Sequence, residues 1–142
     1  MKATVPKIVS IAASELEELV VNVEGTKEER CGFLLGHDNG VRVVTHVVPA
    51  ANVASRDRHM RFEVDALEYL RAEKFAVSMQ LTLLGIYHSH PNSPAVPSET
   101  DLRNAQPYFS YVILSVMKER FTEIRSWRLN QAHQFEEETV IL

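Results

Sequence analysis

A dense apolar run, residues 81–87, stops at two histidines and a loop that contains three prolines. An apolar run of this length, bounded by turn residues, is typical of a buried β-strand. We therefore predict that it forms the central strand of a sheet. The prolines, Pro91, Pro94 and Pro97, restrict the backbone that follows, so the loop is expected to hold the strand end open as the rim of a site.

Helices and strands are predicted on both sides of this run, in an order that indicates the fold class. Three ranges carry helical periodicity or helix-start signals: 14–24, 65–78 and 98–105. Six further ranges are predicted as strands: 31–36, 41–48, 61–64, 108–117, 121–129 and 135–141. Grouped runs of this kind indicate an α+β fold, with a mixed or mostly antiparallel sheet flanked by helices, in a single domain over residues 1–142.

Local signals predict how some elements begin, end and pack. Ser14, with Glu17 three residues later, fits a capping box at the start of the first helix, and Gly25 fits the position just after its end. Residues 136–138 are all glutamate, which predicts that the last strand is a solvated edge of the sheet. Trp127 is expected to be a core residue.

Charge balance and cysteine content exclude several classes of function. With 15 Lys+Arg and 19 Asp+Glu, the formal net charge is −4, so the chain lacks the positive field of nonspecific nucleic-acid binding. Cys31 is the only cysteine, so no intrachain disulfide can form, and we expect it to be a small buried residue. No apolar run reaches ~18 residues and the N-terminal residues lack a secretory signal, so we expect a cytoplasmic protein without a membrane segment.

Two histidines, His88 and His90, follow directly on the predicted central strand. Residues i and i+2 of an extended chain project to the same face, about 6.6 Å apart along the strand. Two imidazoles placed in this way can converge on one ion at Zn–N distances of about 2.0–2.1 Å. The alternative is that both are solvated histidines at the end of a strand.

Asp101 and Ser98 lie at the start of the predicted helix 98–105. Asp101 is either a third metal ligand or an acid that only compensates the helix dipole. Ser98 either caps the helix, since Ser-x-x-Asp is a capping pattern, or donates a hydrogen bond to a developing oxyanion. These two roles compete for one hydroxyl group.

Two histidines and one carboxylate leave the fourth position of a tetrahedral Zn²⁺ open, as in catalytic rather than structural zinc sites. Such a zinc lowers the pKa of its bound water to about 7 and polarises a carbonyl group. The set then lacks only a general base, and a carboxylate close to the metal but not bound to it is expected in that role.

The spacing His88-x-His90, seven residues, Ser98-x-x-Asp101 resembles the signature of the JAMM/MPN metalloproteases at every fixed position. That family carries a catalytic glutamate upstream, often as Glu-x-Cys-Gly-x-Leu-x-Gly, and residues 29–36 fit this pattern as Glu-Arg-Cys-Gly-Phe-Leu-Leu-Gly. The flanking residues also look like bacterial members. The resemblance spans residues 14–127 and implies the family's fold, with α/β/α layering similar to that of cytidine deaminases.

The resemblance implies a role for each of these residues. His88, His90 and Asp101 would bind one Zn²⁺ per chain. Glu29 would be the general acid/base for the zinc water, and Ser98 would stabilise the oxyanion. The family hydrolyses amide or isopeptide bonds at the C-terminal tail of ubiquitin or ubiquitin-like β-grasp proteins, and its bacterial members process sulfur-carrier proteins of that fold or related peptides.

The implied function is thus a zinc metallopeptidase or isopeptidase with a ubiquitin-like or sulfur-carrier protein, or a peptide, as substrate. The alternative is a noncatalytic MPN-type scaffold, although such scaffolds typically lack one or more of the ligands and this chain lacks none.

Two clusters of charged residues remain open to interpretation. Glu28 lies next to Glu29 in a charge run, and Glu29 is favoured as the base only by its spacing to the Cys-Gly pair. Arg56, Arg58 and Arg61 precede the helix at residue 65. Such a cluster is usually solvated, but it could also hold a peptide carboxylate.

Overall fold

The computed structural model describes residues 6–142, which form seven strands and three helices. In chain order these are β1 (Ile8–Ile11), α1 (Ala13–Val23), β2 (Cys31–Asp38), β3 (Val41–Ala50), α2 (Ala66–Ser78), β4 (Thr82–Pro91), α3 (Glu99–Asn104), β5 (Ser110–Met117), β6 (Arg120–Leu129) and β7 (Phe135–Ile141). No helix in this part of the chain is long and apolar enough to cross a membrane.

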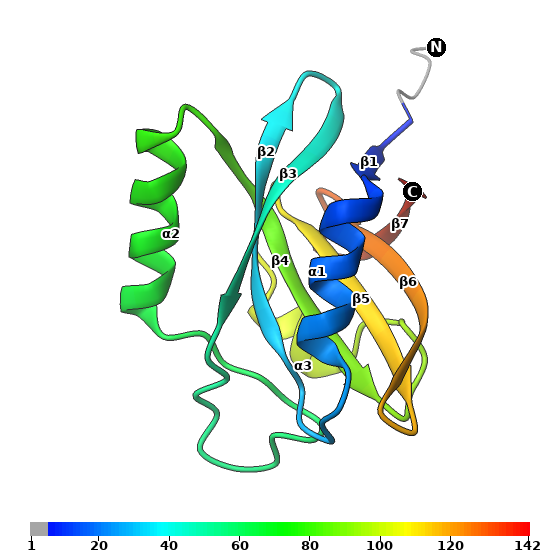
Figure 1. The fold of residues 1–142 in the computed structure, drawn as a ribbon. Coiled ribbons are helices and arrows are strands. Elements are labelled where there is room, and N and C mark those ends of the chain that lie inside the picture. Colours follow the sequence, from blue (N-terminus) through cyan, green and yellow to red (C-terminus); the bar gives the residue numbers. More distant parts are fainter. Residues whose placement is uncertain (1–5) are drawn as a thin grey trace.

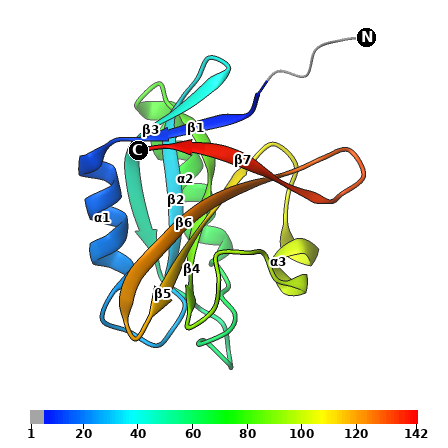
Figure 2. The same cartoon turned by 90° about the vertical axis from the view of Figure 1, so that its right-hand side faces the viewer.

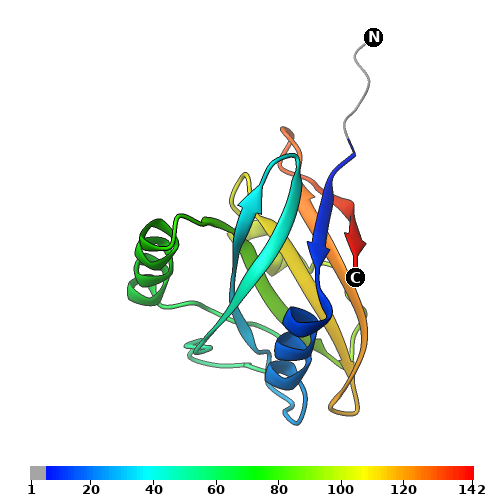
Figure 3. The same cartoon turned by 45° about the horizontal axis from the view of Figure 1, so that its top comes forward.

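All seven strands belong to one closed sheet, in the order β1-β3-β2-β4-β5-β6-β7. β4 pairs antiparallel with β2 and parallel with β5, so the sheet is mixed, as predicted. β1 runs parallel to both β3 and β7 and closes the ring, which places the first and last strands side by side (Figures 2 and 3). The predicted α+β class is confirmed. The closure of the sheet is a feature that the prediction did not include.

The two faces of the sheet carry separate hydrophobic clusters. Neighbouring residues of a strand point to opposite faces, so consecutive side chains can belong to different clusters. Leu34 and Tyr87 pack in the cluster that includes α1, whereas Phe33 and Ile86 pack in the cluster that includes α2. α1 and α2 therefore cover opposite faces of the sheet, which is the expected α/β/α layering (Figure 1).

β4 is the central strand predicted from the apolar run, and its residues 84–90 are buried. Gly85 permits a close approach of β5, because a Cβ at this position would collide with the carbonyl oxygen of Ser110. At the end that carries the two histidines, β4 pairs with β2 as far as His88 and with β5 as far as Pro91.

The first helix begins differently from the prediction. Its N-cap is Ala12, without a side-chain hydrogen bond, and the Ser14 hydroxyl instead donates to Glu15 at 2.6 Å. The predicted capping box was therefore wrong, because Ser14 already lies inside the first turn. Gly25 does follow the C-cap residue and has a φ of 77°, as expected of a residue at this position.

The predicted strand at residues 61–64 does not form. The side chain of Asn52 bonds two of the backbone groups in this segment, the Arg61 carbonyl and the Glu63 N–H, and the Glu63 carbonyl accepts the backbone N–H of Val53 at 2.9 Å. Nδ2 of Asn52 donates to the carbonyl oxygens of Glu29 and Arg61 at 2.9 and 3.1 Å. Its Oδ1 accepts from the backbone N–H groups of Ala54 and Glu63, both at 3.1 Å.

The last strand is not a sheet edge, contrary to the prediction. β7 pairs with β6 on one side and with β1 on the other. Glu138 is only 4% exposed, accepts a hydrogen bond from the Ser126 hydroxyl and forms an ion pair with Arg128. Glu136 and Glu137 stay exposed, so only Glu138 of the three glutamates is taken out of solvent, by its contacts with Ser126 and Arg128 of β6.

Candidate active site

His88 and His90 lie at the end of β4 with their imidazole rings on the same side of the strand, as the i, i+2 spacing predicts. Their Nε2 atoms are 3.1 Å apart, and both residues are buried. Phe62 stacks on the His88 ring with a centroid distance of 4.5 Å and an interplanar angle of 26°. The two imidazoles therefore converge on one point, and the alternative of two solvated histidines is excluded.

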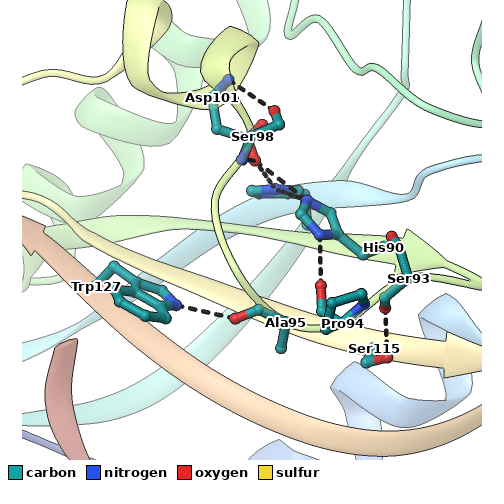
Figure 4. Close-up of polar contacts among 9 residues, drawn as sticks. His90, Ser93, Pro94, Ala95, Ser98, Asp101, Ser115 and Trp127 are labelled. Atoms are coloured by element: carbon teal, nitrogen blue, oxygen red, sulfur yellow. Dashed lines mark hydrogen bonds and ion pairs between the residues drawn. The ribbon is translucent and has the colours of Figure 1, made fainter. Parts of the chain in front are cut away.

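Asp101, in the first turn of α3, meets the two histidines through a single carboxylate oxygen. Its Oδ2 lies 3.2 Å from Nε2 of His88 and 3.1 Å from Nε2 of His90. The same oxygen accepts the backbone N–H of Ser98 at 2.9 Å (Figure 4). Asp101 is thus part of this cluster as well as an acid at a helix N-terminus.

The three facing atoms, Nε2 of each histidine and Oδ2 of Asp101, suit a divalent cation. Atoms bound at about 2.0–2.1 Å to a tetrahedral zinc are about 3.3–3.4 Å from one another, close to the separations in this cluster. Nδ1 of His90 lies 2.9 Å from the carbonyl oxygen of Pro94. A carbonyl oxygen only accepts, so Nδ1 carries the proton and Nε2 of neutral His90 presents its lone pair to the cluster.

Two opposing effects shift the pKa values of the cluster: burial of the side chains and the interactions with nearby charged groups. Burial lowers the pKa of His88. Burial also acts against protonation of His90, but hydrogen bonds to Asp101 and to the Pro94 carbonyl raise its pKa overall. For Asp101, the two imidazoles and the Ser98 N–H outweigh burial and hold the pKa well below its usual range. The carboxylate is therefore an anion in a place where a cation is strongly favoured.

Glu29 lies two residues before β2, beside the end of β4. Ser89 joins the two segments, because its N–H donates to the Arg30 carbonyl at 2.9 Å and its hydroxyl accepts the Arg30 N–H at 2.8 Å. One ligand atom from each of Glu29, His88 and His90 lies within 4.8 Å of the other two. The structure therefore brings the upstream glutamate to the histidine pair.

The Glu29 side chain is 3% exposed, and its Oε1 has no hydrogen-bond partner among the described residues. Burial raises the pKa of Glu29 to about 8. Glu28, by contrast, is exposed, and its backbone N–H bonds to the Thr26 hydroxyl. Of the two neighbouring acids, only Glu29 faces the cluster.

Ser98 is the N-cap of α3, and its Oγ accepts the backbone N–H of Asp101 at 3.0 Å (Figure 4). The capping role is therefore real. A hydroxyl group has one donor and two acceptor positions, so the accepted bond leaves the O–H free to donate. The capping and oxyanion roles, expected to compete, are compatible in this geometry.

The loop between His90 and Ser98 is held by side chains that sequence reasoning did not assign to the site. The Ser115 hydroxyl, from β5, donates to the Ser93 carbonyl at 2.6 Å. The Trp127 indole, from β6, donates to the Ala95 carbonyl at 3.0 Å (Figure 4). Trp127 is thus half-buried against this loop rather than a plain core residue, and no local pattern in the sequence indicates that contact.

A cavity of about 450 Å³ adjoins the cluster. Its walls include His88 and Asp101 on the cluster side, and residues 54–55, residues 61–64, Tyr69 of α2 and Asn104 of α3 on the other sides. Its volume lies in the range of about 300–1,000 Å³ that is usual for small-ligand sites. A reactant bound there would be next to the converging histidines.

Cys31 is fully buried, and burial raises the pKa of its thiol to about 12. A thiol in this environment is inert as a nucleophile. The expectation of a small buried cysteine is confirmed.

The chain is similar to several curated proteins whose names state an activity. The chain is 29% identical over 127 residues to a desampylase of Pyrococcus furiosus, which covers 89% of this chain and 85% of the relative. It is 40% identical over 88 residues to a desampylase of Haloferax volcanii, 61% of this chain and 62% of the relative. It is 31% identical over 103 residues to a CysO-cysteine peptidase of Mycobacterium tuberculosis, 72% and 68% of the two chains.

The fold is shared with solved structures. A protein from Desulfitobacterium hafniense superposes with a TM-score of 0.82 at 30% identity, covering 94% of this chain and 92% of that one. Residues 12–130 match the family described as prokaryotic homologs of the JAB domain. The protein therefore belongs to this family, and it is a hydrolase of the bacterial JAMM/MPN type.

Proposed function

We propose that the protein is a zinc-dependent metallopeptidase or isopeptidase that hydrolyses an amide or isopeptide bond at the C-terminal tail of a ubiquitin-like, sulfur-carrier-type protein or a related peptide. The observation that carries the proposal is the convergence of His88, His90 and Asp101 beside a buried carboxylate. Relatives named as desampylases and as a CysO-cysteine peptidase support a substrate of this kind.

In this proposal His88, His90 and Asp101 hold one zinc ion. Zinc bound there supplies Lewis acidity to a water molecule and to the scissile carbonyl group. The hydrogen bonds from His90 to Pro94 and from Ser98 to Asp101 fix the orientation of two of the three ligands. The fixed orientation means that little rearrangement is needed on binding.

Glu29 is the general acid/base of the reaction. Its carboxylate accepts a proton from the attacking water as the new C–O bond forms, and gives that proton to the leaving nitrogen as the C–N bond breaks. Burial raises the pKa of Glu29 toward the pH of the reaction, which favours both steps, because a base that later acts as an acid works best there. Its unpartnered Oε1 leaves an acceptor position open for the water.

Ser98 stabilises the oxyanion. The O–H group, free while Oγ accepts the Asp101 N–H, donates to the carbonyl oxygen as negative charge develops on it. A noncatalytic scaffold, the alternative function, has no use for an unpartnered buried carboxylate beside two histidines.

The proposal is tested by incubating the zinc-loaded protein with a β-grasp carrier protein that is extended at its C-terminus, and by following the mass of the carrier. We expect release of the unextended carrier by the wild-type protein and no release by Glu29→Gln. Intact substrate after prolonged incubation with a fully zinc-loaded wild-type protein would contradict the proposal.

A further inference from the structure

Glu29 precedes β2 and lies outside the sheet, in which the pairing of this strand starts at Cys31. Its backbone meets residues 51–65, the long connection between β3 and α2 (Figure 1). The Glu29 N–H donates to the carbonyl oxygen of Arg58 at 2.6 Å, and the Glu29 carbonyl oxygen accepts from Nδ2 of Asn52 at 2.9 Å. Both polar backbone groups of the proposed acid/base are thus bound by this connection.

The same connection places Phe62 on His88. The two rings are stacked with a centroid distance of 4.5 Å. A metal-binding histidine is usually oriented by a hydrogen bond at its other ring nitrogen, as His90 is by its contact with the Pro94 carbonyl. The buried Nδ1 of His88, by contrast, has no hydrogen-bond partner among the described residues. Packing against Phe62 therefore takes the place of that hydrogen bond in orienting the His88 ring.

The side chain of Asn52 links these two contacts. Besides its bond to Glu29, Nδ2 donates to the Arg61 carbonyl oxygen, and Oδ1 accepts the Glu63 N–H, both at 3.1 Å. These two bonds hold the residues on either side of Phe62. An amide offers two donor hydrogens and an oxygen that accepts twice, and all four positions are used here.

We infer that Asn52 is a positioning residue of the reaction, whose amide fixes the base Glu29 relative to the segment that orients the ligand His88 through Phe62. The inference rests on the proposed function, because it concerns the placement of the base beside the zinc ligands. Asn52 does not line the cavity, so it acts only through these other residues. Loss of its Nδ2 donors should disturb both zinc binding and proton transfer.

Asn52→Asp tests the donor half of this side chain. An ionised carboxylate of the same shape still accepts from the two backbone N–H groups, but it cannot donate to the two carbonyl oxygens. Asn130→Asp is the matched control. Asn130 also organises a turn, between β6 and β7, with an Oδ1 that accepts two backbone N–H groups at 2.9 and 3.0 Å, and it does not line the cavity.

Phe62→Leu tests the stacked ring separately, because it keeps an apolar side chain but removes the aromatic face next to His88. Phe75→Leu is its control, since Phe75 is 40% exposed on α2 and does not line the cavity. For every variant, zinc affinity is measured by competition with a chromogenic chelator. The release of a C-terminally extended β-grasp carrier at saturating zinc gives kcat and KM, and denaturant titration gives the free energy of unfolding.

For Asn52→Asp we expect the Kd for zinc to rise and kcat to fall, each on the order of 10–100-fold, the usual effect of losing a group that orients a metal ligand. KM should stay near the wild-type value, because the substituted residue is outside the cavity. Phe62→Leu should raise the Kd for zinc on the order of 10-fold. Its kcat at saturating zinc should exceed that of Asn52→Asp, because Glu29 keeps its hydrogen bonds. Both controls should keep the wild-type zinc affinity and kcat.

A residue that only stabilised the connection would lower the free energy of unfolding and leave the zinc affinity and kcat of the folded protein unchanged. That result for Asn52→Asp would overturn the inference, as would wild-type zinc affinity in Phe62→Leu. Asn52→Ser, which removes the donors without adding a charge, is measured in the same way if Asn52→Asp does not fold. Failure of both to fold would identify Asn52 as a folding residue and would also overturn the inference.

The proposed function fails in a different way. A wild-type protein that binds zinc but cleaves no carrier would contradict the proposed function, and with it the role of Asn52 in placing the base. The zinc affinities of Asn52→Asp and Phe62→Leu would still decide whether Asn52 orients His88 through Phe62.

Discussion

Oδ2 of Asp101 accepts the backbone N–H of Ser98 at 2.9 Å, while the Asp101 N–H bonds back to the Ser98 hydroxyl at 3.0 Å. This reciprocal pair starts helix α3. It also aims the carboxylate at the two histidines, because the oxygen that accepts from Ser98 is the one that faces them. Helix initiation and ligand orientation thus depend on the same two hydrogen bonds.

We expect one zinc ion per chain after chelation and reconstitution, measured by elemental analysis of the purified protein. The double variant His88→Ala, His90→Ala should lose it, because two of three ligands are removed. His37→Ala, which changes an exposed histidine of β2, should retain it. Zinc content equal to that of the wild type in the double variant would refute the ligand assignment.

Glu29→Gln should keep the fold and the zinc ion but lose hydrolysis, with kcat reduced by at least about 10²–10⁴-fold, the usual contribution of a general acid/base. Glu28→Gln is the matched control, because it changes the neighbouring exposed acid, and it should remain active. Steady-state rates of carrier release give the comparison. Similar losses in both variants would show that the wrong glutamate has been assigned.

Ser98→Ala removes both the cap and the free O–H group. We expect a loss of about 0.5–2 kcal/mol in the free energy of unfolding, from denaturant titration, because the Asp101 N–H loses its acceptor. If the hydroxyl also donates to the oxyanion, kcat should fall by about 10²–10³-fold with zinc retained. A change in stability alone would identify Ser98 as a cap only.

Ser98→Asp separates the two effects. Aspartate is a good N-cap, so stability should return to near the wild-type value. An ionised carboxylate cannot donate a hydrogen bond, so the rate should not return. A stable and fully active Ser98→Asp protein is incompatible with the oxyanion role.

Glu138→Gln should destabilise the protein by about 3–5 kcal/mol, the usual effect of removing one partner of a buried ion pair, because Arg128 is left without its counter-charge. Glu137→Gln, one residue earlier, changes a half-exposed glutamate that lies 3.9 Å from Arg125 and should cost about 0–1 kcal/mol. Thermal or denaturant unfolding of the two variants measures the contrast. Equal effects would contradict the buried role of Glu138.

The sequence predicts the central strand and the histidine pair well because both are local patterns. An apolar run identifies β4, and the i, i+2 spacing at its end dictates that His88 and His90 share a face. The spacing from Ser98 to Asp101 likewise predicts the cap, since one helical turn brings the two residues together. In these cases, residues that are close in the sequence are also close in the structure.

Features that depend on distant residues could not be predicted in this way. β1 is only four residues long, and its pairing with β7 joins segments about 130 residues apart in the chain. Glu138 of the same strand is buried against Ser126 and Arg128 of β6, although its neighbours in sequence indicate an exposed edge. Residues 61–64 are held by hydrogen bonds from the Asn52 side chain across a loop instead of by a strand ladder, and such contacts leave no periodic pattern in the sequence.

The parallel pairing of β1 with β7 also bears on how the chain assembles during synthesis. The strands that carry the candidate site, β2 and β4, can pair as soon as residues up to 91 have left the ribosome. The ring stays open until β7 emerges, and until then β1 and β6 present unpaired backbone groups that can template pairing with another nascent chain. Translation that stops before residue 135 would therefore yield a product with its histidines in place and two unpaired strand edges. Such a product would be a substrate for chaperones and proteases and not an active enzyme.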